Sequence, residues 1–267
     1  MHDIINTKKQ NMKPLILISN DDGYDMPGIN YLASVARQWG DVIVVAPDGP
    51  RSGASLSVTF QRPLSARIVR QETGLTVYAC NGTPTDCVKL AISQFCPRRP
   101  DLVLGGINHG DNSAVNVHYS GTMGVVIEGC LKGIPSVGFS YCSHSMDIDF
   151  QPMRPYIDKV LEYVLAHGLP QGVCLNVNAP DANHYRGMKL CSMGSGLWKN
   201  ELACMDHPRG GKYYWLVGEF DAETRDTPSS DFRCLKEGYI TITPTKTDVT
   251  AWEAMNELAG LQIEAGG

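Results

Sequence analysis

Residues 15–29 read LILISNDDGYDMPGI, an apolar run that ends directly in two neighbouring aspartates and a glycine. A continuous apolar segment of this length, here residues 15–19, is typical of a strand that is covered on both faces. The spacing of apolar residues in 27–39 predicts a helix soon after the loop. Asp21 and Asp22 repel each other in that loop unless a cation or a proton lies between them. The stretch therefore predicts a strand–loop–helix unit whose loop needs a counter-charge.

The same alternation continues through the first two thirds of the chain. Further strands are predicted at residues 41–48, 75–80, 101–108, 134–140 and 173–180, and further helices at 83–95, 122–133 and 152–168. Nearly continuous apolar strands that alternate with helices indicate an α/β fold with a mostly parallel sheet flanked by helices. In such folds the functional site lies beyond the carboxyl ends of the strands. Polar clusters follow four of these strands, at residues 20–22, 48–55, 81–85 and 108–122.

The last third has a different character. Residues 207–220, HPRGGKYYWLVGEF, are typical of a hairpin arm, and residues 237–250 alternate like an exposed strand pair. The tail from Ala251 has the spacing of a short amphipathic helix. We expect three parts: a disordered polar leader at 1–12, a catalytic core at 13–180, and hairpin arms with a C-terminal segment at 181–267.

Composition narrows the class of protein. The chain has 267 residues, is 43% hydrophobic, and carries a formal net charge of -5. This balance argues against broad binding to nucleic acid or to anionic membranes, and the longest apolar runs are of strand length. We therefore expect neither nucleic acid nor a membrane among the partners. Nine cysteines, an odd number without a CxxC pair, predict reduced thiols in a cytoplasmic protein.

The polar clusters supply oxygen atoms of several kinds. Asp21 and Asp22 offer carboxylates, Ser52 in RSGAS offers a hydroxyl, and Asn108 in GGINHGDN offers an amide carbonyl. Oxygen ligands with partial negative charge suit magnesium, manganese or calcium better than zinc or copper. So few protein ligands would leave positions for water and a substrate oxygen. The alternative is that the two aspartates only cap the following turn.

A second polar group opens the helix predicted near residue 122. In YSGTMGVVIEG, Ser120 and Thr122 flank Gly121, and free amides at a helix start favour an anion. Ordinary capping by serine or threonine is the alternative. A metal beside an anion site is what phosphoryl transfer requires. The sequence has no GxGxxG, GxxxxGK[ST] or GxSxG motif, so it gives no support to dinucleotide binding, P-loop binding or serine hydrolase chemistry.

Several of these strings closely resemble the SurE (survival protein E) 5′-nucleotidase family. They are SNDDGYDMPGI, APDGPRSGAS, NGTPTDCV, GGINHGDN, YSGTMGVVIEG, PRGGKYYWLVGE and SDFRCLKEGYITITP. The likeness runs in order from about Lys13 to Thr250. It implies a Rossmann-like core and a metal-dependent phosphatase that acts on nucleoside monophosphates. One departure is NSAVNV at 112–117, where family members often read NLGDDV, and it puts substrate preference in question.

The resemblance also implies a set of roles for individual residues. The family's metal ligands fall on Asp21, Asp22, Ser52 and Asn108, and its phosphate contacts fall on Asn112, Ser120, Gly121 and Thr122. One divalent ion per subunit, Mg²⁺ or Mn²⁺, is expected as the cofactor. Family members extend hairpin arms and exchange C-terminal segments between subunits, so a homodimer or homotetramer is expected.

The resulting hypothesis is a metal-dependent phosphomonoesterase, a 5′-nucleotidase, in which Asp21 and Asp22 are the catalytic residues. Whether it also acts on a broad range of phosphomonoesters or on short polyphosphates is left open. So is the choice of the aspartate that takes a proton from water. Two alternatives remain. One is a phosphatase that forms an aspartyl-phosphate, and the other is a metal-dependent nucleotide sensor that binds without turnover.

Overall fold

The computed structural model describes residues 12–222 and 227–261, so the expected leader lies almost wholly outside the described residues. Nine strands form the central sheet, in the order β3-β4-β2-β1-β5-β6-β7-β13-β8. The run from β4 to β7 is parallel, whereas β3 and β13 are antiparallel to their neighbours β4 and β7. The strands are β1 (Leu15–Ser19), β2 (Asp41–Pro47), β3 (Ala66–Glu72), β4 (Leu75–Cys80), β5 (Leu102–His109), β6 (Ser136–Tyr141), β7 (Val173–Ala179), β8 (Met188–Leu190) and β13 (Ile240–Lys246). The predicted α/β class with a mostly parallel sheet is confirmed.

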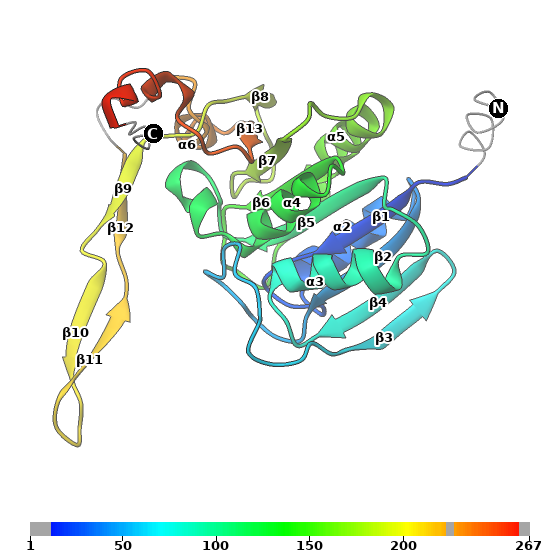
Figure 1. The fold of residues 1–267 in the computed structure, drawn as a ribbon, viewed down its shortest axis with the longest axis horizontal. Helices are drawn as coiled ribbons and strands as arrows, with labels where there is room; N and C mark the ends of the chain where they lie inside the picture. The colour runs from blue at the N-terminus through cyan, green and yellow to red at the C-terminus, as the bar shows by residue number, and fades with distance from the viewer. Residues whose placement is uncertain (1–11, 223–226, 262–267) are drawn as a thin grey trace, which may run out of the picture.

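Helices cover both faces of this sheet (Figure 1). They are α2 (Pro27–Ala36), α3 (Pro84–Leu90), which continues as the π-helical turn η1 (Ala91–Phe95), α4 (Gly121–Leu131) and α5 (Arg154–His167). Ile16 and Ile18 of β1 pack in the cluster that includes α2 and α5, whereas Leu15 and Leu17 pack in the cluster that includes α3 and α4. Burial on both faces explains why β1 has no polar alternation.

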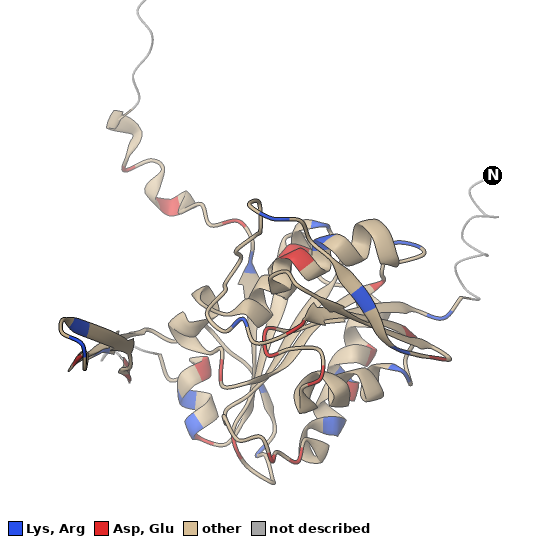
Figure 2. Ribbon diagram, turned by 90° about the horizontal axis from the view of Figure 1, so that it is seen from below, with Lys and Arg blue, Asp and Glu red and all other residues tan. Residues whose placement is uncertain are grey.

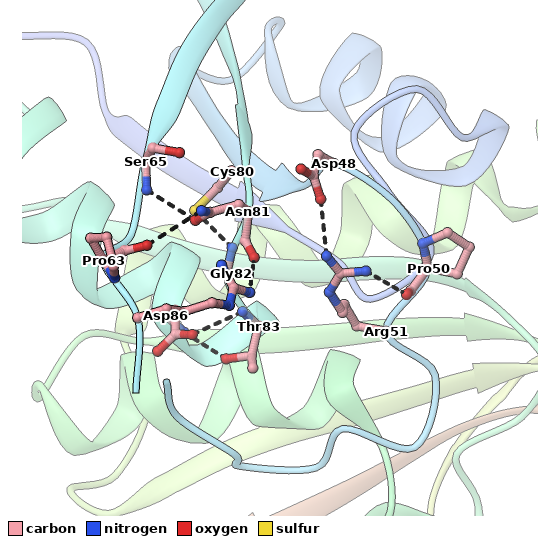
Figure 3. Close-up of polar contacts among 11 residues, drawn as sticks. Asp48, Pro50, Arg51, Pro63, Ser65, Cys80, Asn81, Gly82, Thr83 and Asp86 are labelled. Atoms are coloured by element: carbon pink, nitrogen blue, oxygen red, sulfur yellow. Dashed lines mark hydrogen bonds and ion pairs between the residues drawn. The ribbon is translucent and has the colours of Figure 1, made fainter. Parts of the chain in front are cut away.

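The helix starts follow the expected capping chemistry. Thr83 caps α3 and forms a capping box with Asp86, with Pro84 in the first turn (Figure 3). The Oγ of Ser120 accepts a hydrogen bond from the backbone N–H of Met123 at 2.9 Å and so caps α4. These caps fix the points at which the chain turns from strand ends into helices.

Two predictions about local structure need correction, and one strand was missed. The strand β3 was not predicted, because it is an exposed edge strand with mostly charged and polar side chains. Residues 237–250 do not form an exposed strand pair, since β13 is one strand between β7 and β8 with Ile240 and Thr241 fully buried. The tail forms the 3₁₀ turns η4 (Trp252–Ala254) and η5 (Ala259–Leu261) in place of a helix. Its large apolar side chains are more than half exposed, so burial contributes little to stabilising so short a helix.

The predicted hairpin arm is confirmed as a long two-stranded projection (Figure 1). Its root pairs β9 (Gly196–Lys199) with β12 (Glu219–Ala222), and its tip pairs β10 (Leu202–Asp206) with β11 (Lys212–Leu216). Gly210 and Gly211 have positive φ angles of 90° and 88° in the tip turn, a conformation that favours glycine. The remaining short elements are η2 (Ala114–His118), η3 (Gln151–Met153) and α6 (Asp231–Lys236).

Charged residues of both signs are interspersed over the elements in Figure 2. All nine cysteines are free thiols, and Cys204 on the arm is the one that is exposed. Across 12–222 and 227–261, no helix combines the length and the apolar character needed to cross a membrane.

Candidate active site

A pocket of about 380 Å³ lies beyond the carboxyl ends of β1 and β5. Five of the eight predicted site residues line it: Asp21, Ser52, Asn108, Asn112 and Ser120. The other three, Asp22, Gly121 and Thr122, lie against residues of that set but do not line the pocket. Three of the four polar clusters that follow predicted strands, at 20–22, 48–55 and 108–122, therefore converge at one edge of the sheet, whereas residues 81–85 do not line this pocket.

Asp21 is held at the floor of the pocket by the start of α4. It is 4% exposed, and its Oδ1 accepts a hydrogen bond from the Thr122 hydroxyl at 2.7 Å. A Cβ added at Gly121 would lie 2.6 Å from the Cβ of Asp21, so only glycine allows this close approach. Burial raises the pKa of Asp21 from 3.8 to about 6; the Thr122 bond acts against that rise and the charge of Asp22 adds to it.

Asp22 follows Asp21 directly in the loop after β1. Its Oδ2 accepts a hydrogen bond from the backbone N–H of His109 at 3.2 Å. Burial raises the pKa of Asp22, although the His109 N–H and the nearby His144 lower it in part. Among the described residues, no lysine or arginine forms an ion pair with either aspartate. Two partly or fully buried carboxylates thus stand together without a cationic side chain.

The neighbouring oxygens fit a hard divalent cation better than any other group. The described part of the chain holds no cluster of three His, Cys, Asp or Glu side chains arranged for a metal. A cation here would therefore depend on neutral oxygens beside Asp21 and Asp22. Asn108 donates its Nδ2 to the carbonyl of Gly110 at 2.7 Å, so its Oδ1 is the atom left for a ligand. The pair of carboxylates without a counter-charge fits such an ion.

Ser52 reaches the pocket on the loop that follows β2. Figure 3 shows how Arg51 holds this loop: its guanidinium contacts the Asp48 carboxylate and the Pro50 carbonyl, each at 3.0 Å. The backbone N–H of Arg51 donates to the carbonyl of Asp21 at 2.7 Å. The loop is thereby docked directly on the first strand end, and Ser52 itself stays exposed.

Asn112 is fixed by side chains of the sheet that the sequence did not single out. Its backbone N–H donates to the Oδ1 of Asn178 and its Nδ2 donates to the Oγ of Ser140, each at 2.8 Å. Asn176 donates its Nδ2 to the carbonyl of Asn112, also at 2.8 Å. The alternation LNVN in β7 was the available signal, because residues two apart point to one side of a strand.

The two hydroxyl groups at the start of α4, those of Ser120 and Thr122, form different hydrogen bonds. Ser120 accepts from Met123, which confirms that it caps the helix, and its own proton remains available to a ligand. Thr122 directs its proton to Asp21 and is fully buried. The structure therefore gives the Thr122 side chain a contact with the carboxylate, and phosphate binding at this position would use its backbone amide.

Asp231 of α6 is a further buried acid that the sequence did not single out; it does not line the pocket but binds a loop next to it. It is fully buried and accepts hydrogen bonds from the backbone N–H groups of Gly194 at 2.8 Å and Ala114 at 3.2 Å. It also accepts from the Thr243 hydroxyl at 3.2 Å. Burial raises its pKa. Asp231 thus joins the pocket loop around Ala114 to the base of the arm and to β13.

Comparison with known proteins agrees with this arrangement. The family model described as "Survival protein SurE" matches residues 16–200. A protein named 5′-nucleotidase SurE from Phocaeicola vulgatus is 56% identical over 94% of this chain and 98% of its own length, and one of the same name from Bacteroides thetaiotaomicron is 51% identical over 94% and 97%. The crystal structure of the SurE protein from Aquifex aeolicus superposes with a TM-score of 0.79 at 35% identity, covering 93% of this chain and 99% of that one. The chain belongs to the SurE family.

Proposed function

We propose that this protein is a metal-dependent 5′-nucleotidase that hydrolyses nucleoside monophosphates to nucleoside and phosphate. The observation that supports the proposal is the pair of neighbouring carboxylates: Asp21 lines the pocket, Asp22 lies next to it, and neither forms an ion pair with a lysine or arginine among the described residues. Its relatives at 51–56% identity carry the name 5′-nucleotidase SurE over nearly their full length. Their name describes an enzyme, so it gives no support to a sensor without turnover.

Four residues would hold one divalent ion, Mg²⁺ or Mn²⁺: Asp21, Asp22, Ser52 and Asn108. Such an ion supplies a Lewis acid for the phosphoryl oxygens and makes a bound water more acidic. Asp21 and Asp22 hold their charge beside the reacting phosphate, and one of them accepts the proton of the attacking water.

The phosphate is bound next to the two acids by Asn112, Ser120, Gly121 and Thr122. Ser120 offers the proton of its hydroxyl, and the first turn of α4 offers its positive end. Asn112 is kept in place by Ser140, Asn176 and Asn178. Preorganised donors of this kind lower the cost of developing charge on the phosphoryl group.

A covalent aspartyl-phosphate is disfavoured by the position of Asp21. Its side chain is almost fully buried, and one carboxylate oxygen is occupied by the Thr122 hydroxyl. A nucleophile must reach the phosphorus in line with the leaving oxygen, which this bond and the close contact with Gly121 oppose.

The exposed arm and the free thiols support proposals about assembly and location. Tyr214, Trp215 and Leu216 on the arm are 61%, 62% and 82% exposed, which is unusual for large apolar side chains. We propose that the arm and the C-terminal segment pack on further copies of the chain in a homodimer or homotetramer. Nine free thiols support a cytoplasmic location.

The test is phosphate release from 5′-AMP and from a panel of phosphomonoesters, with Mn²⁺ or Mg²⁺ and with EDTA. We expect release that depends on the metal and is lost in Asp22→Asn. Asp25→Asn is the matched control, since Asp25 is an exposed carboxylate on the same loop. Metal-loaded protein that binds 5′-AMP but releases no phosphate would refute the proposal.

A further inference from the structure

The pocket has a second half that the phosphate chemistry does not use. Beside the acids and amides, its lining includes the aromatic residues Tyr119 and Trp198. Tyr119 directly precedes Ser120 at the start of α4, and Trp198 comes from β9 at the root of the arm. The volume of about 380 Å³ is within the range of small-molecule sites. A phosphate group bound at Ser120 would fill only part of this space.

Trp198 is held in a defined position at the pocket. Its indole Nε1–H donates to the Oδ1 of Asn116 at 2.9 Å, and Asn116 in turn donates to Asp111 at 2.8 Å. Phe220 packs edge-on to the indole, with ring centroids 6.1 Å apart and an angle of 68° between the planes. These contacts occupy the nitrogen and one side of the ring. An aromatic ring fixed before binding loses little entropy when a ligand packs against it.

Tyr119 differs from Trp198, because its backbone is fixed whereas its side chain is largely exposed. Its backbone is fixed, since its N–H donates to Asn116 and its carbonyl accepts from Ser55, at 3.0 and 3.2 Å. Its side chain is 60% exposed although it is large and aromatic. Fixed backbone beside the phosphate site and an open ring are what a stacking contact requires. Single exposed aromatic residues are common on protein surfaces, so it is the position of Tyr119 in the lining of this pocket that points to a ligand.

We infer that Tyr119 and Trp198 form the nucleobase subsite of this enzyme, with Trp198 bringing the root of the arm into substrate binding. This inference rests on the proposed function. The base stacks on the aromatic faces while the 5′-phosphate lies at Ser120. Aromatic faces stack with any base, so all nucleoside monophosphates are substrates, and purines gain more than pyrimidines because their faces are larger.

The test compares substrates that share the phosphate end and differ in the base. Trp198→Leu retains an apolar side chain but removes the aromatic face, and Trp198→Phe retains a flat ring. We expect the ratio of kcat/KM for 5′-AMP to that for ribose 5-phosphate to fall about five- to a hundredfold in the leucine variant, mainly through KM. The phenylalanine variant should keep most of that ratio. Trp39→Leu is the matched control, because Trp39 follows α2, outside both the pocket and the arm.

A binding measurement makes the inference independent of turnover. Stacking of adenine quenches indole fluorescence, so the phosphonate analogue of 5′-AMP, which is not hydrolysed, should quench the wild type and not Trp198→Phe. Ribose 5-phosphate should quench neither protein. Equal losses for 5′-AMP and ribose 5-phosphate in Trp198→Leu, or quenching that survives in Trp198→Phe, would overturn the subsite. Failure of the proposed function would look different, as absence of phosphate release from both substrates by the wild type.

Discussion

Replacing Asp21 with asparagine should stabilise the metal-free protein above pH 6 and abolish its stabilisation by divalent metal. Asp21 is 4% exposed, and burial raises its pKa from 3.8 to about 6. Below about pH 4 the carboxyl group of Asp21 is protonated in both the folded and the unfolded chain, so its burial does not lower the free energy of unfolding. As pH rises from 4 to 6 the unfolded chain releases the proton first, so the free energy of unfolding falls. Above pH 6 the full cost of about 3 kcal/mol is present.

The asparagine variant removes this charge without removing the local contact. Its Oδ1 can still accept the hydrogen bond that Thr122 donates to Asp21. In EDTA at pH 8 we therefore expect the free energy of unfolding to rise by up to about 3 kcal/mol, or roughly 6–12 °C in Tm. The decline in stability of the wild type between pH 4 and 6 should also flatten. With a divalent ion the wild type should become the more stable of the two proteins, because the ion stabilises only the protein that binds it.

Thermal unfolding followed by circular dichroism, in EDTA and in Mn²⁺ across pH 4–8, measures both effects. Asp25→Asn, an exposed change on the same loop, should behave as the wild type. A variant at Asp21 that is less stable than the wild type in EDTA at pH 8 would refute the cost assigned to the buried charge. Equal stabilisation of both proteins by Mn²⁺ would remove Asp21 from the metal site.

Three further changes probe the start of α4 and the arm. Thr122→Val removes the donor to Asp21, so Mn²⁺ affinity measured by calorimetry should fall about ten- to a hundredfold, whereas Thr122→Ser should retain it; an unchanged affinity in the valine variant would contradict this role. Gly121→Ala places a Cβ 2.6 Å from that of Asp21, so hydrolysis of 5′-AMP should fall at least about tenfold, and wild-type rates would show that the loop yields freely. Leu216→Asp puts a charge on an exposed apolar side chain of the arm, and sedimentation velocity should then show smaller particles; unchanged assembly would exclude this part of the arm as the contact.

Much of the fold could be predicted because its signals are local. The strands from β1 to β7 that lie in the sheet interior are short apolar runs, and Thr83 and Ser120 cap the helices that follow two of them. Parallel strands bring their carboxyl ends to one edge, so the converging clusters followed from the alternation alone. Asp21, Ser52 and Asn108 were accordingly expected near one another, and the structure places all three in one pocket.

What could not be predicted depends on contacts between distant parts of the chain. β13 pairs with β7, a strand far away in the sequence. The alternation of its residues predicted an exposed strand pair, whereas Ile240 is fully buried. Asp231 meets Ala114 across 117 positions, and nothing near either residue in the sequence signals the other. Asn176 and Asn178 were within a predicted strand, but their contact with Asn112 required the neighbouring strand to be placed first.

The position of β13 also sets the order of events during synthesis. β13 lies between β7 and β8, and among the described strands β8 is the edge strand that pairs with β13. About 60 residues, including the whole arm, separate the end of β7 from the start of β13. At about 5–20 residues per second, the ribosome needs about 3–12 s to supply the missing strand. During that interval the edge of β7 can pair with strands of other nascent chains. Slow translation after residue 179 would therefore lengthen the period in which aggregation competes with completion of the sheet.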